Sequence, residues 1–165
     1  MKIVFEYRSS IILFNILLGL PNKKPFILPS NICPIVIATF KKAKRPFTFV
    51  DISLKTFEMN KEKLIEIIKE KPDAYGGILW LRPYGINKSN EAFFLTVKKL
   101  NKKIFIIDDC CLSKPSLSFE NHNQDLTLFS TGYSKYIDYG WGGFGWINSK
   151  EINYSRTDLM YNNND

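Results

Sequence analysis

The sequence predicts an α/β fold in which a mostly parallel central sheet carries helices on both faces. Short apolar runs alternate with helical stretches along the chain, and this alternation requires right-handed crossovers between parallel strands. The run IFII at 104–107 contains no polar residue, as expected for a strand covered on both faces. A length of 165 residues, 45% of them hydrophobic, suffices for one domain. We therefore expect one α/β domain over residues 1–150 and a polar tail over 151–165.

The elements of the first half are predicted in order from their residues. Ser9 or Ser10 is expected to begin the first helix, because a serine hydroxyl accepts hydrogen bonds from the free N–H groups at a helix start. Gly19 and Pro21 are expected to end it. Asn60 is expected to cap a later helix whose apolar face includes residues 64, 65, 67 and 68. The elements between these two helices are a strand over 26–28, a helix over 33–42 and a strand over 47–50.

The second half continues the alternation. Its expected elements are a helix that starts at Ser89 or Asn90 and strands over 77–81, 104–107, 126–129 and 144–147. Ligands of parallel sheets bind beyond the carboxyl ends of the strands. The polar groups expected at those ends are Asp51, the RPYG segment over 82–85, Asp108 with Asp109, and residues 130–135. An active site is therefore sought among them.

Composition limits the classes of function. The net charge is +7, but the lysines are scattered in pairs, which predicts a solvated surface and no nucleic-acid partner. The three cysteines, Cys33, Cys110 and Cys111, include an adjacent pair and do not suit a disulfide framework. No CxxC occurs, and the single histidine, His122, has no company of metal ligands. We expect no metal site, and reduced thiols in a cytoplasmic protein.

The apolar run over 11–20 could mark export. It follows Lys2 and Arg8, as in a signal peptide. However, Glu6 lies in the would-be basic region, Asn15 interrupts the run, and no small-residue cleavage site follows. The run is also too short to span a bilayer. A buried helix is therefore favoured, with export as the alternative, and no membrane partner is expected.

Two strand ends carry side chains that could bind a ligand or take part in a reaction. Asp108 and Asp109 follow an apolar strand; a carboxylate there can meet a cationic ring nitrogen or cap a loop, and position alone does not choose between the two acids. Ser130 begins a segment of three Ser or Thr residues and a glycine that suits a phosphate. Lys135 lies five residues beyond Ser130. A partly desolvated lysine can attack a carbonyl, whereas the alternative is an ordinary surface lysine.

The segment GWGGFG at 140–145 literally matches GxGxxG. A dinucleotide site also needs a buried strand before the motif, a helix after it and an acidic residue further on. Here YIDY precedes the motif and a strand-like GWIN follows part of it. We therefore reject the dinucleotide interpretation and expect a tight backbone turn close to a ligand or to Lys135.

Taken together, these segments resemble the DegT-type (DegT/DnrJ/EryC/StrS) sugar aminotransferase family of fold type I pyridoxal phosphate enzymes. The matching segments, in the family's order, are RSSI (8–11), LPSNIC (28–33), FVDI (49–52), PYG (83–85), DDCC (108–111), FSTGYSK (129–135) and GWGG (140–143). The most specific is the Ser-to-Lys spacing of five downstream of the strand-end Asp. The resemblance implies the large domain of that fold, with the family's small C-terminal domain absent.

The resemblance also implies roles for individual residues. Lys135 is implied to hold pyridoxal 5′-phosphate (PLP) as a Schiff base and to move a proton during transfer. Asp109 is implied to keep the ring nitrogen protonated, so that the ring accepts electrons. Ser130, together with Ser9 or Ser10, is implied to bind the cofactor phosphate.

Two positions implied to lie at the cofactor depart from the family pattern. Cys33 stands where members often have an aromatic residue over the ring, and Leu112 stands where Gln or His commonly bonds the ring hydroxyl. The implied reaction moves an amino group from an amino-acid donor, glutamate by analogy, to a nucleotide-sugar acceptor, in a homodimer. The alternative is a truncated, non-catalytic relative that serves as a binding or interaction module or as one half of a split enzyme.

Overall fold

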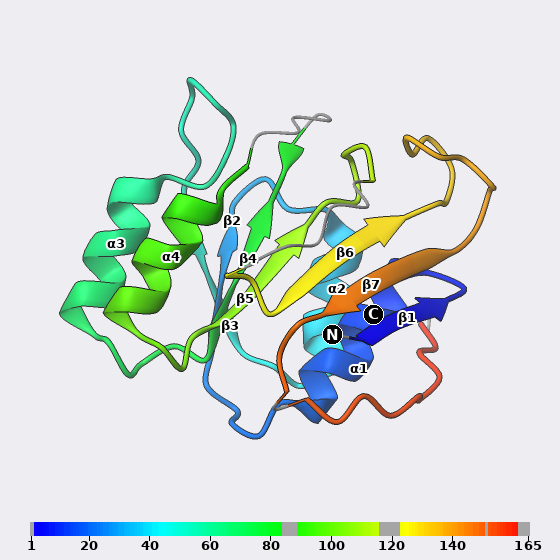
Figure 1. Ribbon diagram of the computed structural model, residues 1–165, viewed down its shortest axis with the longest axis horizontal. Helices are drawn as coiled ribbons and strands as arrows, with labels where there is room; N and C mark the ends of the chain where they lie inside the picture. Colours follow the sequence, from blue (N-terminus) through cyan, green and yellow to red (C-terminus); the bar gives the residue numbers. More distant parts are fainter. Residues whose placement is uncertain (1, 84–88, 116–122, 151, 162–165) are drawn as a thin grey trace.

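A computed structural model confirms the predicted α/β fold. It describes residues 2–83, 89–115, 123–150 and 152–161, so the end of the PYG segment and His122 lie outside the described residues. One seven-stranded sheet has the order β1-β7-β6-β5-β4-β2-β3 (Figure 1). The strands are β1 Lys2–Glu6, β2 Phe26–Pro29, β3 Phe47–Val50, β4 Gly77–Leu81, β5 Phe105–Asp109, β6 Leu126–Ser130 and β7 Gly143–Ile147. The helices are α1 Ser9–Gly19, α2 Pro34–Lys42, α3 Lys61–Glu70 and α4 Glu91–Leu100.

The sheet is mostly parallel, as predicted. Strands β2 to β6 pair in parallel, whereas β7 is antiparallel to β6 and β1 is antiparallel to β7. Strand β1 is not predicted from the sequence. Its three apolar residues, Ile3 to Phe5, are flanked by Lys2 and Glu6, and only Val4 and Glu6 of the strand are buried. Its partner β7 lies at a distant position in the chain, so no local hairpin marks it.

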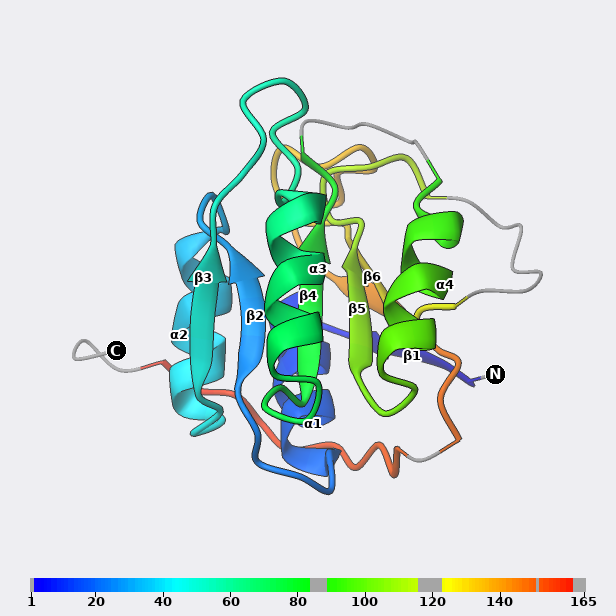
Figure 2. The same cartoon turned by 90° about the vertical axis from the view of Figure 1, so that its left-hand side faces the viewer.

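Helices cover both faces of the sheet. Figure 2 shows α3 and α4 in front of the sheet and α1 and α2 behind it. Because side chains alternate along a strand, β5 contributes Phe105 and Ile107 to the core beneath α1 and α2 and Ile106 to the core beneath α3 and α4. Each such side chain contributes about 1.5–3 kcal/mol when fully buried. The strand ends are therefore held from both sides.

The start of α1 differs from the prediction. Its N-cap residue is Arg8, with φ −151° and ψ 146° and no side-chain cap, so Ser9 and Ser10 fall in the first turn. An isolated bridge between Arg8 and Gly142 keeps Arg8 extended. This tertiary contact, and not the preference of serine for the N-cap position, sets the start of the helix. Among the described residues, no helix combines the length and the apolar character needed to cross a membrane.

The starts of α3 and α4 fall where the sequence places them. The Asn60 side chain accepts a hydrogen bond from the Lys63 N–H at 3.0 Å, and Leu64 and Ile68 form the buried face of α3. Asn90 precedes α4, although its side chain makes no capping bond.

Residues 152–161, within the segment predicted as a polar tail, pack against α1. Ile152, Tyr154 and Leu159 contact the core beneath that helix. Asn15, the polar residue in the apolar run of α1, is 1% exposed. Its amide donates to the Thr157 carbonyl at 3.2 Å and accepts from the Thr157 N–H at 3.0 Å. Asn15 therefore attaches the 152–161 segment to the helix.

Asn15→Leu is expected to lower the free energy of unfolding by about 2 kcal/mol, because both hydrogen bonds to the Thr157 backbone are lost. Amide hydrogen exchange should also become faster across 152–161. Thr157→Ala is the matched control, since Thr157 contributes only backbone atoms to these bonds; we expect a change below about 0.5 kcal/mol. Equal urea stability of Asn15→Leu and wild type would contradict the attachment.

Candidate functional site

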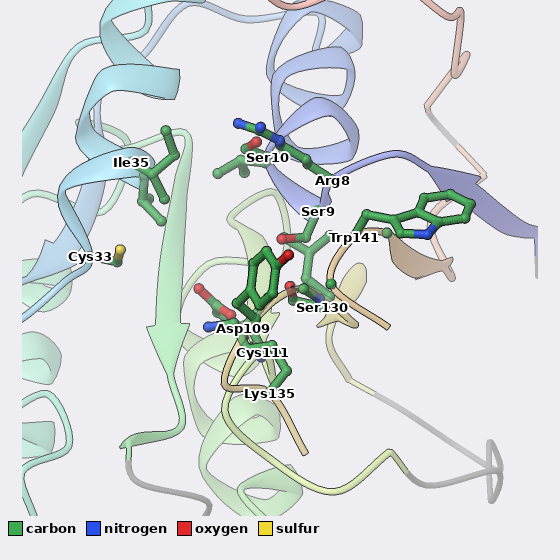
Figure 3. Close-up of a pocket in the computed structure, with 17 residues that line it drawn as sticks. Arg8, Ser9, Ser10, Cys33, Ile35, Asp109, Cys111, Ser130, Lys135 and Trp141 are labelled. Carbon is green, nitrogen blue, oxygen red and sulfur yellow. Dashed lines mark hydrogen bonds between the residues drawn. The ribbon is translucent and has the colours of Figure 1, made fainter. Parts of the chain in front are cut away.

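The carboxyl ends of β5 and β6 meet the N-terminus of α1 around one cavity of about 340 Å³. The start of α2 and the loop between β6 and β7 complete its walls (Figure 3). Its polar lining residues include Arg8, Ser9, Ser10, Cys33, Asp109, Cys111, Ser130, Tyr133 and Lys135. The cavity thus lies at the edge of the sheet where ligands of parallel sheets bind.

The pleat of β5 separates Asp108 from Asp109. Asp109 lies on the α1 face of the sheet and lines the cavity. Asp108 points to the opposite face, where it is 0% exposed and its carboxylate accepts hydrogen bonds from Arg82 Nη2 at 2.5 Å and Arg82 Nε at 2.9 Å. Of the two acids that the sequence leaves as alternatives, Asp109 is the one placed to meet a ligand.

Asp109 is a buried carboxylate at one end of the cavity. It is 5% exposed, and its Oδ1 accepts the Cys111 backbone N–H at 3.0 Å. Burial raises the pKa of Asp109, and the hydrogen bonds from Cys111 and the positive charge of Lys135 oppose that rise. A desolvated carboxylate gains from a cationic partner. This end of the cavity therefore suits a ligand with a positive charge.

Lys135 is carried by the loop between β6 and β7, which its own hydrogen bonds hold in shape. The Asp138 carboxylate accepts from the Ser134 N–H at 2.9 Å and from the Gly140 N–H at 2.8 Å. Ser134 and Gly140 have φ values of 60° and 75°, in the left-handed region. This compact loop brings the half-buried Lys135 to the cavity, and Figure 3 shows it beside Asp109.

The glycine-rich segment forms a tight turn beside this loop. Gly142 has φ 98°, and its N–H donates to the Tyr7 carbonyl at 2.7 Å. A Cβ on Gly143 would lie 2.5 Å from the Ser9 nitrogen, so the missing side chain lets α1 begin against β7. A strand and no helix follows the turn, in agreement with the rejection of a dinucleotide motif.

The N-terminus of α1 suits an anion. Its first turn holds no acidic residue, and no side chain caps it. The first N–H groups of a helix lack intrahelical partners, and the helix dipole favours negative charge there. Ser9 and Ser10 line the cavity at this end, opposite Cys33, and Ser130 lies beside them (Figure 3). Arg8 adds a positive charge to the lining.

Most of the predicted site residues come together in this cavity. Its lining includes Ser9, Ser10, Cys33, Asp109, Ser130 and Lys135. Leu112 is not part of the lining and is 36% exposed.

Sequence reasoning did not single out several other lining residues. These are Arg8, Cys111, Tyr133 and Trp141. Their signal in the sequence is proximity, because each lies within two residues of a predicted site residue or inside the glycine-rich segment.

The similarity of this chain to known proteins lies in its fold. No protein-family model matches the sequence, and no curated protein matches it. An aminotransferase from Psychrobacter cryohalolentis is similar with a TM-score of 0.74 and 13% identity, over 90% of this chain and 38% of that chain. A DegT DnrJ EryC1 StrS aminotransferase from Brucella abortus is similar with a TM-score of 0.71 and 17% identity, over 92% and 43%.

A third similar structure is the Escherichia coli GDP-4-keto-6-deoxy-D-mannose-3-dehydratase with bound hydrated PLP, with a TM-score of 0.74 and 20% identity, over 90% of this chain and 40% of that chain. The chain thus spans about 40% of the length of the solved structures that it resembles. Over that portion, this chain has the same α/β fold as these two aminotransferases and the PLP-bound dehydratase.

Proposed function

We propose that this chain binds PLP in the cavity through Lys135, and that the protein moves an amino group from an amino acid, glutamate, to a keto nucleotide sugar. The observation that carries the proposal is one cavity that joins a buried carboxylate, a lysine and an uncapped helix N-terminus. The fold shared with aminotransferases supports it.

The residues present fit the chemistry of PLP. The cavity volume of about 340 Å³ lies in the usual range for small-molecule sites, roughly 300–1,000 Å³. Asp109 suits the cationic ring nitrogen, Lys135 suits the aldehyde, and the start of α1 with Ser130 suits the phosphate. When bound, PLP would supply an electron sink for reactions at the α-carbon of an amino acid.

Each side chain would act through a specific group. The Asp109 carboxylate would accept a hydrogen bond from the protonated ring nitrogen and favour its charged form. Lys135 Nζ would be the group that takes up and returns a proton at the reacting carbon. The Ser130 hydroxyl and the N–H groups at the start of α1 would hold the phosphate and so fix the orientation of the ring.

Protein incubated with PLP is expected to turn yellow and, after borohydride reduction, to carry a pyridoxyl group on Lys135, because a lysine amine that lines the cavity can attack an aldehyde bound there. Peptide mass spectrometry locates the label. Lys135→Ala should stay colourless and unlabelled, whereas Lys103→Ala, which changes an exposed lysine outside the cavity lining, should behave as wild type. A colourless wild type, or a label on another lysine, would contradict the proposal.

A non-catalytic binding module is the second candidate function. The position of Leu112 outside the cavity favours it, because the resemblance implies a ring contact at that residue. Glutamate added to the PLP-loaded protein separates the two candidates. Loss of the yellow colour supports amino transfer, and a colour that persists supports the module.

The proposed partner is a second copy of the chain, in the cytoplasm. Large aromatic side chains are exposed on the loop between β6 and β7, which carries Lys135: Tyr133 at 81%, Tyr136 at 62%, Tyr139 at 73% and Trp141 at 62%. Exposed apolar patches of this kind mark interaction surfaces.

The three cysteines are free thiols, which supports a reducing compartment such as the cytoplasm.

A further inference from the structure

We propose that Arg82 is a positioning residue that holds the end of β5 so that the Asp109 carboxylate faces the cavity; this inference rests on the proposed function. Arg82 makes two kinds of contact with that strand end. Its backbone N–H donates to the Asp109 carbonyl at 3.0 Å. Its guanidinium donates to the Asp108 carboxylate through Nη2 at 2.5 Å and Nε at 2.9 Å.

The backbone contact extends the sheet by one step. The last register pair of β4 and β5 is Leu81 with Asp109, and Arg82 continues the ladder just beyond β4. This bond holds the Asp109 main chain on the β4 side, while the Cys110 N–H, which donates to the Leu128 carbonyl at 2.9 Å, holds the strand end on the β6 side.

The side-chain contact fixes the orientation of the same strand end. Successive side chains of a strand point to opposite faces, so clamping the Asp108 carboxylate on one face directs Asp109 to the other. Arginine suits this task, because its planar fork binds a carboxylate through two bonds and resists rotation. A twist of β5 at this point would carry Asp109 out of the cavity.

The ion pair between Arg82 and Asp108 is poorly explained as a device that stabilises the fold. Asp108 is 0% exposed and the Arg82 side chain is 16% exposed, so both charges lose most of their hydration. A buried ion pair seldom stabilises a fold more than well-packed apolar side chains of similar volume. Its position beneath the cavity, one residue from Asp109, points instead to orientation.

Binding of pyridoxine 5′-phosphate tests the inference, because this probe has the ring nitrogen and the phosphate of PLP but no aldehyde for Lys135. Arg82→Met is expected to weaken its binding about tenfold, through displacement of Asp109. Binding of inorganic phosphate, which needs only the start of α1 and Ser130, should stay unchanged. Arg82→Lys should bind the probe with intermediate affinity, because it keeps the charge and loses the fork.

A double variant separates positioning from folding. Arg82→Met with Asp108→Leu replaces the ion pair by apolar side chains, so its melting temperature should stay near that of wild type, while its affinity for pyridoxine 5′-phosphate should remain reduced. Wild-type affinity in this variant, or equal weakening of both probes by Arg82→Met, would overturn the positioning role and leave the proposed function standing. A wild-type protein that does not bind pyridoxine 5′-phosphate would overturn both.

Discussion

An Asp109→Asn variant is expected to bind PLP about 100-fold more weakly than wild type, because a hydrogen bond between charged groups is worth up to about 3 kcal/mol. The substitution keeps the size of the side chain, and the amide oxygen can still accept the Cys111 N–H that Asp109 Oδ1 accepts. The loss therefore reports the charge and not the shape of the cavity. Spectrophotometric titration with PLP measures it.

The same variant, without PLP, is expected to be more stable than wild type at neutral pH. Burial raises the pKa of Asp109 above its unfolded value of about 3.9. Between the two pKa values the folded protein holds more protons than the unfolded one, so the carboxylate destabilises the fold increasingly as pH rises through that window. Asparagine does not ionise, and the stability difference should be largest at neutral pH and smallest near about pH 3.

Thermal melts from acid to neutral pH check this dependence. Asp73→Asn is the control, since Asp73 is an exposed carboxylate outside the cavity lining, and its melting profile should follow wild type. An Asp109→Asn variant that is less stable than wild type at neutral pH would contradict the cost of burying this carboxylate. Unchanged PLP affinity of the Asp109→Asn variant would contradict the role of the Asp109 carboxylate in binding.

The centre of the sheet could be predicted from the sequence because its strands are buried on both faces. All five residues of β4, and all five of β5, are buried, so their apolar runs stand out from the amphipathic helices. Strand β1 has a shorter apolar run, Ile3 to Phe5, between Lys2 and Glu6, and only alternate residues of this edge strand are buried. The start of α1 depends on the bridge between Arg8 and Gly142, which residues near the helix cannot reveal.

The candidate site could be found because parallel strands bring their carboxyl ends to one edge. Asp109 and Ser130 end the neighbouring strands β5 and β6. Their proximity therefore follows from the strand order and does not depend on the loops. Leu112 lies further along the chain after β5, where the position of a side chain depends on the turn. A turn closed by the Ser113 N–H and the Cys110 carbonyl at 2.9 Å follows β5, and Leu112 lies within it, outside the cavity lining.

Gly143→Ala is expected to lower the free energy of unfolding by about 2 kcal/mol and to weaken PLP binding about tenfold. A Cβ at this position would lie 2.5 Å from the Ser9 nitrogen, 2.8 Å from the Ser9 Cα and 3.0 Å from the Phe129 carbonyl oxygen. These are backbone atoms of α1 and β6, which cannot rotate away as a side chain can. The start of α1 must therefore shift, and the N–H groups that hold the phosphate shift with it. Chemical denaturation and PLP titration measure the two effects.

Gly132→Ala is the matched control in the neighbouring loop. The nearest atom to its added Cβ is the Ser130 Oγ at 3.6 Å, which is an ordinary van der Waals contact, so we expect a stability change below about 0.5 kcal/mol. Gly132 lines the cavity, Gly143 directly follows the lining residue Gly142, and of the two only Gly143 approaches the helix start. The comparison therefore isolates the approach of β7 to α1. Equal PLP affinity in the two alanine variants would mean that this approach does not set the position of the phosphate site.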